Sequence, residues 1–133
     1  MTYALDTNTI IHYLRKDPAI RQRFRETQEQ GHDFVLPRMV DYEVRRGFRI
    51  APAPKKEAAY AVLTEGLNIV ELDADVWETA ENIYAELYQK DFTVGEMDIL
   101  IAAVCLANDY TLVTGNTKDF ENIDGLKLVD WRA

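Results

Sequence analysis

Short apolar runs alternate along the chain with longer segments in which apolar residues recur at helical spacing. Tyr3-Ala4-Leu5 and Phe34-Val35-Leu36 are runs of the kind that buried strands show, and each is bounded by polar or turn-forming residues. The segment from Asp73 to about Lys90 instead repeats apolar residues every three or four positions, which predicts an amphipathic helix. The predicted strands are Tyr3–Leu5, Phe34–Leu36, Asn68–Leu72, Thr111–Thr114 and Leu126–Val129.

Helices are predicted between these strands. Asp6-Thr7-Asn8 are capping residues, and the helix that they begin continues to about Lys16, where Asp17-Pro18 interrupts the pattern. Met97–Asn108 is apolar nearly all round, so we expect a central, buried helix there. The other predicted helices are Ala19–Gln30, Arg38–Ile50, Lys55–Gly66 and the segment capped by Asp73. Strands separated by helices predict an α/β fold with a mainly parallel sheet.

Length and composition indicate a single domain over residues 1–133. An apolar share of 47% with 29% charged residues is that of a globular protein, not of a disordered chain. No apolar run is long enough to span a bilayer, and Met1–Asp6 does not resemble the start of a signal peptide. Cys105 is the only cysteine and lies in an apolar stretch, so we expect a buried thiol in a reduced, cytoplasmic setting.

The net charge of −8 is unfavourable for a nucleic-acid-binding protein, but the charge is unevenly distributed. Residues 1–56 carry eleven basic and seven acidic residues, whereas residues 57–133 carry four basic and sixteen acidic residues. The local field, more than the total charge, attracts a phosphate backbone. The basic first half therefore permits an RNA partner, although solvated helix faces are the better explanation for most of these residues.

Four acidic residues are predicted to approach one edge of the sheet, beyond the carboxyl ends of its strands, where ligands bind in such folds. Asp6 ends the first strand, Glu43 is on the helix that follows the second, Asp98 is in the first turn of the buried helix, and Asp119 lies in a predicted turn, Gly115–Phe120. Each has a structural explanation, as a helix cap, a partner of neighbouring arginines, a dipole-stabilising residue or a turn residue. These separate explanations account less well for the fact that all four acids are predicted at the same edge of the sheet.

Crowded carboxylates repel one another unless a cation lies among them, so the cluster predicts a divalent-metal site. Mg²⁺ prefers such oxygen ligands and keeps several waters. A zinc site is not expected, because His12 and His32 have no cysteine or histidine partner at ligand spacing.

Four short motifs carry a resemblance to a known family over nearly the whole chain. They are Leu5-Asp6-Thr7-Asn8, Glu43-Val44-Arg45-Arg46-Gly47, Asp98-Ile99-Leu100-Ile101-Ala102-Ala103 and Thr114-Gly115-Asn116-Thr117-Lys118-Asp119-Phe120. Their order and context are similar to those of PIN-domain ribonuclease toxins of the VapC type. The resemblance implies a PIN-like three-layer α/β/α fold.

The resemblance also implies the residues of the site. It makes Asp6, Glu43, Asp98 and Asp119 the catalytic and metal-binding acids, with Mg²⁺ or Mn²⁺ as the cofactor. It implies supporting polar roles for Thr7, Asn8, Glu96, Thr114 and Asn116. Glu96 either extends the site or faces solvent.

The activity that this family implies is metal-dependent endonucleolytic cleavage of structured RNA, such as tRNA or ribosomal RNA, leaving 5′-phosphate and 3′-hydroxyl ends. The implied partners are a VapB-type antitoxin and a second copy of the chain in a homodimer. Operator DNA is expected to be contacted only indirectly, through the antitoxin, and no membrane is expected.

Three alternative functions each require particular sequence features. An aspartate-dependent phosphatase typically has a second aspartate two residues after the first, where this chain has Asn8. A phosphoacceptor receiver domain needs paired early acids and a late lysine, and neither is evident. A PIN fold that binds RNA or protein without cleaving it is disfavoured by the complete set of acids.

Aromatic residues on the two middle helices offer a further candidate surface. Trp77, Tyr84 and Tyr88 lie on the later of these helices and Tyr60 on the earlier one. A partner groove is possible there, but their helical spacing favours packing in the core. Trp131 is expected to pack back onto the last strand.

Overall fold

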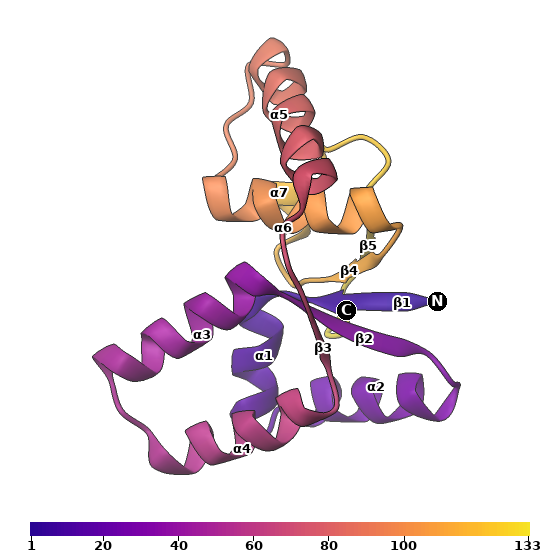
Figure 1. Ribbon diagram of the computed structural model, residues 1–133. Coiled ribbons are helices and arrows are strands. Elements are labelled where there is room, and N and C mark those ends of the chain that lie inside the picture. The colour runs from indigo at the N-terminus through magenta and orange to yellow at the C-terminus, as the bar shows by residue number, and fades with distance from the viewer.

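Five parallel strands form one sheet in the order β3-β2-β1-β4-β5 in the computed structural model, which describes all 133 residues (Figure 1). The strands are β1 (Thr2–Leu5), β2 (Asp33–Pro37), β3 (Asn68–Val70), β4 (Thr111–Val113) and β5 (Lys127–Val129). From β1 the chain adds β2 and β3 on one side, and it then crosses to add β4 and β5 on the other. The strand order therefore reverses between β1 and β4, which makes a topological switch point there.

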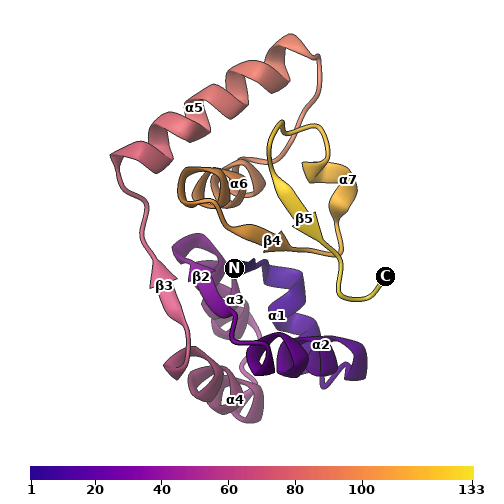
Figure 2. The ribbon, with the colours of Figure 1, turned by 90° about the vertical axis from the view of Figure 1, so that its right-hand side faces the viewer.

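Helices cover both faces of this sheet. They are α1 (Thr7–Leu14), α2 (Pro18–Glu29), α3 (Arg38–Ile50), α4 (Pro54–Glu65), α5 (Ala74–Gln89), α6 (Glu96–Asn108) and α7 (Thr117–Phe120). Figures 1 and 2 place α1 to α4 on one side of the sheet and α5 to α7 on the other. The predicted three-layer α/β/α fold is confirmed, and every strand pair is parallel.

The predicted elements all form, with boundaries that differ by one or two residues at several ends. The predicted strand Asn68–Leu72 ends at Val70, and the predicted turn Gly115–Phe120 contains the short helix α7. The hydroxyl of Thr114 accepts a hydrogen bond from the Asn116 backbone N–H at 3.0 Å, which turns the chain from β4 into this helix. A single-turn helix has no apolar repeat, so the turn-forming residues of this segment predicted only a turn.

A core of 30 buried apolar residues lies around the sheet. The buried face of α5 consists of Val76, Ala80, Ile83 and Leu87. The preference for core packing is therefore wrong for Trp77, Tyr84 and Tyr88, which are exposed on the other faces of this helix.

Two other aromatic residues are buried. Tyr60 on α4 is only 3% exposed, so core packing is confirmed for it. Trp131 is also buried, and its ring lies edge-on to Phe24 of α2 and Phe34 of β2, at centroid distances of 6.3 and 5.8 Å. The end of the chain is thus held against α2 and β2.

Cys105 is completely buried in α6, as expected. Burial raises the pKa of its thiol to about 12, so the thiolate needed for reactivity is scarce at neutral pH. None of the helices combines the length and the apolar character that crossing a membrane requires.

Candidate active site

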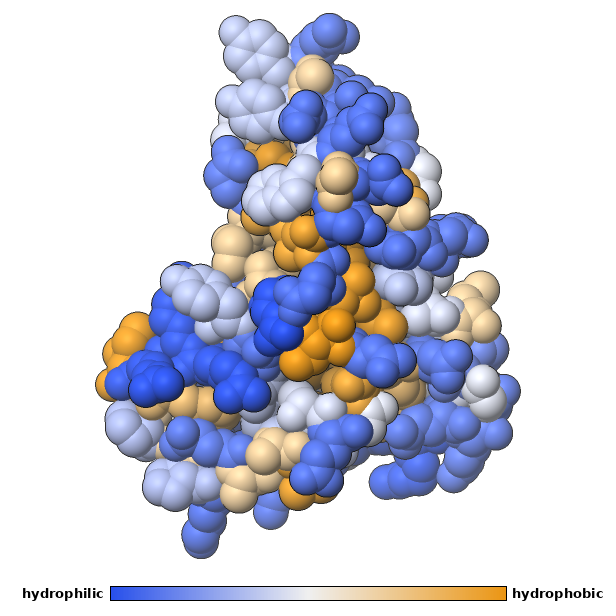
Figure 3. All heavy atoms as spheres, in the orientation of Figure 1, coloured by the Kyte–Doolittle hydropathy of each residue, from blue (hydrophilic) through white to orange (hydrophobic).

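The switch point between β1 and β4 positions the first acid. The backbone N–H of Asp6 donates to the Val113 carbonyl oxygen at 3.2 Å, and the Thr9 hydroxyl donates to the same oxygen at 3.2 Å. These bonds attach the start of α1 to the carboxyl end of β4. Figure 3 shows the surface hollowed on the side toward which β1 runs, between the α3 region and the α5–α6 region.

Asp6 is held rigidly at this edge. Its extended backbone makes it the N-cap of α1, and its Oδ1 accepts a hydrogen bond from the Thr9 backbone N–H at 2.8 Å. The residue is only 6% exposed, so the carboxylate is largely removed from bulk water. One carboxylate oxygen is engaged by the cap, and the second has no hydrogen-bond partner within the chain.

Glu43 on α3 is linked to the same turn. The hydroxyl of Thr7 donates to Glu43 Oε1 at 2.8 Å, and Arg46 Nη2 lies 3.9 Å from Oε2. Arg45, which the sequence also suggested as a partner of Glu43, instead pairs with Asp41 at 2.9 Å. The contact between Thr7 and Glu43 therefore fixes one oxygen of this carboxylate, while the distant Arg46 only loosely balances its charge.

Asp98, in the first turn of α6, is affected by the charges of the other three acids. Its pKa is raised above the ordinary value of 3.8, first by burial and then by the charges of Asp119, Glu43 and Asp6. Helix α6 packs against both α3 and α7, which carry two of these acids. Carboxylates from four separate segments therefore lie close enough for three of them to disfavour ionisation of the fourth.

Asp119 and the polar residues around it lie beyond the end of β4. The side-chain amide of Asn116 donates a hydrogen bond to Asp119 Oδ2 across α7. Thr114 is fully buried, whereas Asn8 and Asn116 are exposed. Asn8, Thr114 and Asn116 all line one cavity of about 190 Å³. Asn116 thus orients an acid directly, and Thr114 supports the turn that carries Asn116.

Glu96 is placed differently from these residues. It is exposed at the start of α6 and lines a hollow of about 340 Å³ together with Trp77 and Tyr84 of α5. Its charge is not among those that act on Asp98. The structure therefore brings Glu96 to the α5 side of the helix and not to the acid cluster.

The oxygen donors of these acids determine whether a divalent ion fits the site. No group of three or more His, Cys, Asp or Glu side chains is arranged so that it could hold a metal ion by itself. However, Asp6, Asp98 and Asp119 form no ion pair, and Glu43 has only the 3.9 Å contact. Oxygen donors with uncompensated charge fit a hard ion that keeps several of its own waters.

One positioning residue escaped the sequence analysis. Thr9 donates through both its backbone N–H and its hydroxyl at the switch point, and its place three residues after the capping aspartate is a signal that could have identified it. Arg46 was expected from the sequence to pair with Glu43, and its Nη2 lies 3.9 Å from Oε2. The direction in which its side chain points depends on the rotation of α3, which packing determines.

An all-parallel sheet between two helical layers, with acids from four segments at its switch point, defines a class of α/β domains with an acidic site. The sequence matches the PIN domain family over residues 3–126, and the chain belongs to that family. The phosphatase and receiver-domain alternatives are therefore set aside.

Similar proteins cover almost the full chain. Ribonuclease VapC2 of Rickettsia felis is 29% identical, and the tRNA(fMet)-specific endonuclease VapC of Shigella flexneri is 28% identical, with 98% of each chain covered in both comparisons. Among solved structures, the fold is similar to a chain of VapBC2 from Rickettsia felis bound to a promoter DNA fragment, with a TM-score of 0.91 and 26% identity over 98% of this chain and 99% of that one. DNA-bound VapBC from Salmonella typhimurium gives 0.89 and 28%, with 98% of both chains covered.

Proposed function

We propose that the protein is a divalent-metal-dependent endoribonuclease and the toxin of a toxin–antitoxin pair. The observation that carries this proposal is the convergence of acids from four segments at the switch point, where the charges of Asp119, Glu43 and Asp6 act on Asp98. Membership of the PIN family and full-length similarity to ribonucleases named VapC support it. A half-buried acid perturbed by several like charges at a switch point is a candidate functional site on physical grounds alone.

Asp6, Glu43, Asp98 and Asp119 would hold Mg²⁺ or Mn²⁺. The bound ion would stabilise charge on the phosphodiester and lower the pKa of a water molecule. Asp6, with one oxygen engaged by the Thr9 N–H, presents its other oxygen in a fixed direction. Glu43 likewise has Oε1 engaged by Thr7, so Oε2 is the oxygen that would accept a proton from the attacking water.

The proposed substrate is structured RNA, either tRNA or ribosomal RNA. The tRNA(fMet)-specific names of the relatives from Shigella flexneri and Salmonella typhimurium support tRNA in particular. Recognition would depend on shape and on unstacked bases, because side chains cannot read the deep, narrow major groove of an RNA helix.

The proposed protein partners are a VapB-type antitoxin and a second copy of the chain. Solved structures similar to this chain are VapBC complexes, two of them with DNA, which supports both an antitoxin and indirect contact with operator DNA. A groove of about 220 Å³ between α1, α3 and α4 is lined by apolar residues such as Leu14 and Phe48, and Glu43 lies at its wall. An antitoxin segment in this groove would reach the acids directly.

One observation favours the alternative of a PIN-fold module that binds RNA or protein without cleaving it. The carboxylates do not form a metal cage by themselves. Cleavage assays separate the two possibilities, because a binding module would leave RNA intact at every metal concentration.

The test uses purified protein and total tRNA with Mg²⁺, with Mn²⁺ or with EDTA. We expect endonucleolytic fragments with 5′-phosphate ends in either metal and none in EDTA. Asp98→Asn should remain folded and leave the RNA intact. Fragments that form equally in EDTA or with Asp98→Asn would rule out the proposed metal-dependent chemistry.

A further inference from the structure

The exposed face of α3 carries aromatic and basic side chains next to the acid cluster. Tyr42 is 53% exposed, and Arg46, one helical turn later, has a side chain that is 51% exposed. Arg49 follows on the same face of the helix, three residues after Arg46. Figure 3 shows strongly hydrophilic side chains gathered over this helix, at the border of the hollow.

Tyr42 and Arg46 form one unit that reaches the candidate active site. Arg46 Cζ lies 5.1 Å from the centroid of the Tyr42 ring, in the range of a cation–π contact. Nη2 of the same guanidinium lies 3.9 Å from Glu43 Oε2. Arg46 therefore stands between an exposed aromatic ring and one of the acids proposed to carry out cleavage.

The chemistry of this pair suits an RNA strand. An exposed aromatic ring is a surface on which an unstacked base can lie, and a guanidinium group neutralises a phosphate. The contact between Arg46 and Glu43 is too long for a strong ion pair, so the guanidinium is available to a ligand. Arg46 lies over one face of the Tyr42 ring, and Tyr42 is 53% exposed, so part of the ring is left open to a base.

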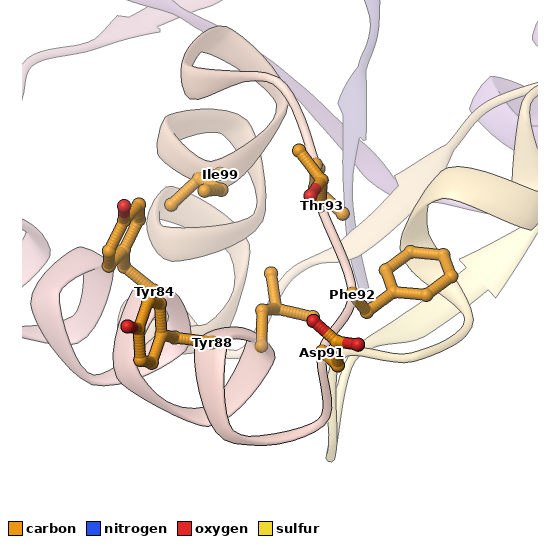
Figure 4. Close-up of a pocket in the computed structure, with 8 residues that line it drawn as sticks. Tyr84, Tyr88, Asp91, Phe92, Thr93 and Ile99 are labelled. Atoms are coloured by element: carbon orange, nitrogen blue, oxygen red, sulfur yellow. The ribbon is translucent and has the colours of Figure 1, made fainter.

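The other exposed aromatic surface has the opposite electrostatic character. Tyr84, Tyr88 and Phe92 line a hollow of about 450 Å³ at the end of α5, and Asp91 is its only charged residue (Figure 4). Helix α5 itself contains four acidic residues and no basic ones. This surface would repel a phosphate backbone, so the aromatic residues of α5 serve as an internal comparison.

We propose that Tyr42 and Arg46 form an RNA-binding platform, on which an unstacked base lies against the Tyr42 ring while Arg46 contacts a phosphate near the scissile bond. This inference rests on the proposed ribonuclease function and specifies how its substrate is held. Both residues act on binding and positioning, while the acids of the cluster carry out cleavage. The platform would select RNA in which a base beside the cleaved linkage is unpaired.

The test measures binding in EDTA, so it does not depend on cleavage. Wild type, Tyr42→Ala, Tyr42→Phe, Arg46→Gln and Tyr88→Ala are titrated against a fluorescently labelled, unstructured RNA oligonucleotide over a range of salt concentrations. We expect Tyr42→Ala to weaken binding about tenfold or more, as the loss of one stacked base predicts. Tyr42→Phe should bind within about twofold of wild type, because a phenyl ring stacks as well. Tyr88→Ala should bind like wild type, although Tyr88 is 77% exposed.

The salt dependence of RNA binding distinguishes the contribution of Arg46 from that of Tyr42. Arg46→Gln should reduce the slope of log affinity against log salt by about 0.7, the value for one phosphate contact on a single strand. Tyr42→Ala should leave that slope unchanged. Sedimentation of each variant shows whether the same face joins two copies of the chain.

Several results would overturn the platform. These are wild-type affinity in Tyr42→Ala, equal losses in Tyr42→Phe and Tyr42→Ala, or a change in oligomeric state that accounts for the loss. If binding depends on Tyr42 but no metal cleaves the RNA, the platform stands and the proposed nuclease function fails. If the RNA is cleaved but binding does not depend on Tyr42, the proposed nuclease function stands and the platform fails.

Discussion

The hydroxyl group of Thr7 donates a hydrogen bond to Glu43 Oε1 at 2.8 Å. This contact joins the first turn of α1 to α3, between residues 36 positions apart. Since Asp6 immediately precedes Thr7, one turn of helix fixes two acids of the cluster at once. The motif that contains Asp6 thus has a positioning residue as well as a carboxylate.

The first prediction concerns this contact. Thr7→Ala should reduce kcat for RNA cleavage by about tenfold, because a hydrogen bond to a charged group contributes about 1.5–3 kcal/mol and Glu43 would lose its fixed orientation. KM should change little, since no proposed RNA-binding residue is altered. Thr7→Ser keeps the hydroxyl and should retain most of the activity. Equal kcat values for Thr7→Ala and wild type would show that the orientation of Glu43 does not matter.

The second prediction follows from the raised pKa of Asp98. Between its unfolded-state and folded-state pKa values, the folded protein binds more protons at this group than the unfolded chain does. The free energy of unfolding therefore falls as pH rises through that window, and the full loss is present at neutral pH. Asp98→Asn should then be more stable than wild type at pH 7, by the roughly 0.5–2 kcal/mol usual for a stabilising substitution, and should differ little at about pH 3.

Urea unfolding in EDTA at both pH values measures this effect. Glu78→Gln is the matched control, because Glu78 is an exposed acid on α5, a helix that carries none of the four acids, and it should change stability little at either pH. An Asp98→Asn protein that is less stable than wild type at neutral pH would contradict the electrostatic account of the cluster.

The third prediction concerns a buried acid outside the site. Asp41 on α3 accepts a hydrogen bond from the Tyr60 hydroxyl at 2.6 Å and pairs with Arg45 and Arg38 at 2.9 and 3.2 Å. Burial by itself raises the pKa of Asp41, but the hydrogen bond from Tyr60 and the two arginines outweigh burial and lower it. The ionised form is thus stabilised in the folded protein, and that stability is lost as pH falls through the lowered pKa.

Tyr60→Phe removes the hydroxyl donor and leaves the Asp41 carboxylate less satisfied. We expect the free energy of unfolding to fall by about 1–3 kcal/mol at pH 7. The loss should shrink at acidic pH, where Asp41 is protonated. Urea unfolding at both pH values checks this, and a loss of equal size at both would mean that packing, and not the hydrogen bond, is responsible.

The sequence predicted the elements well because their signals are local. Apolar runs and capping aspartates marked β1, α1 and α5, and strand-end positions singled out Asp6 and Asp119. The directions in which side chains point could not be predicted from these local signals. The exposure of Trp77 and Tyr88, the pairing of Arg45 with Asp41 and the stacking of Arg46 on Tyr42 all depend on how a helix is rotated against the sheet. That rotation is fixed by packing between segments distant in sequence, which no local pattern encodes.

We propose that acids from four segments together bind a divalent metal, and Mn²⁺ binding followed by electron paramagnetic resonance tests this most directly. Wild type should bind Mn²⁺, and Asp6→Asn, Glu43→Gln, Asp98→Asn and Asp119→Asn should each weaken that binding, by about tenfold or more for Asp6 and Asp98. The control variant Glu78→Gln should bind like wild type. Undiminished Mn²⁺ affinity in Asp98→Asn, or no binding to the wild-type protein, would contradict the account.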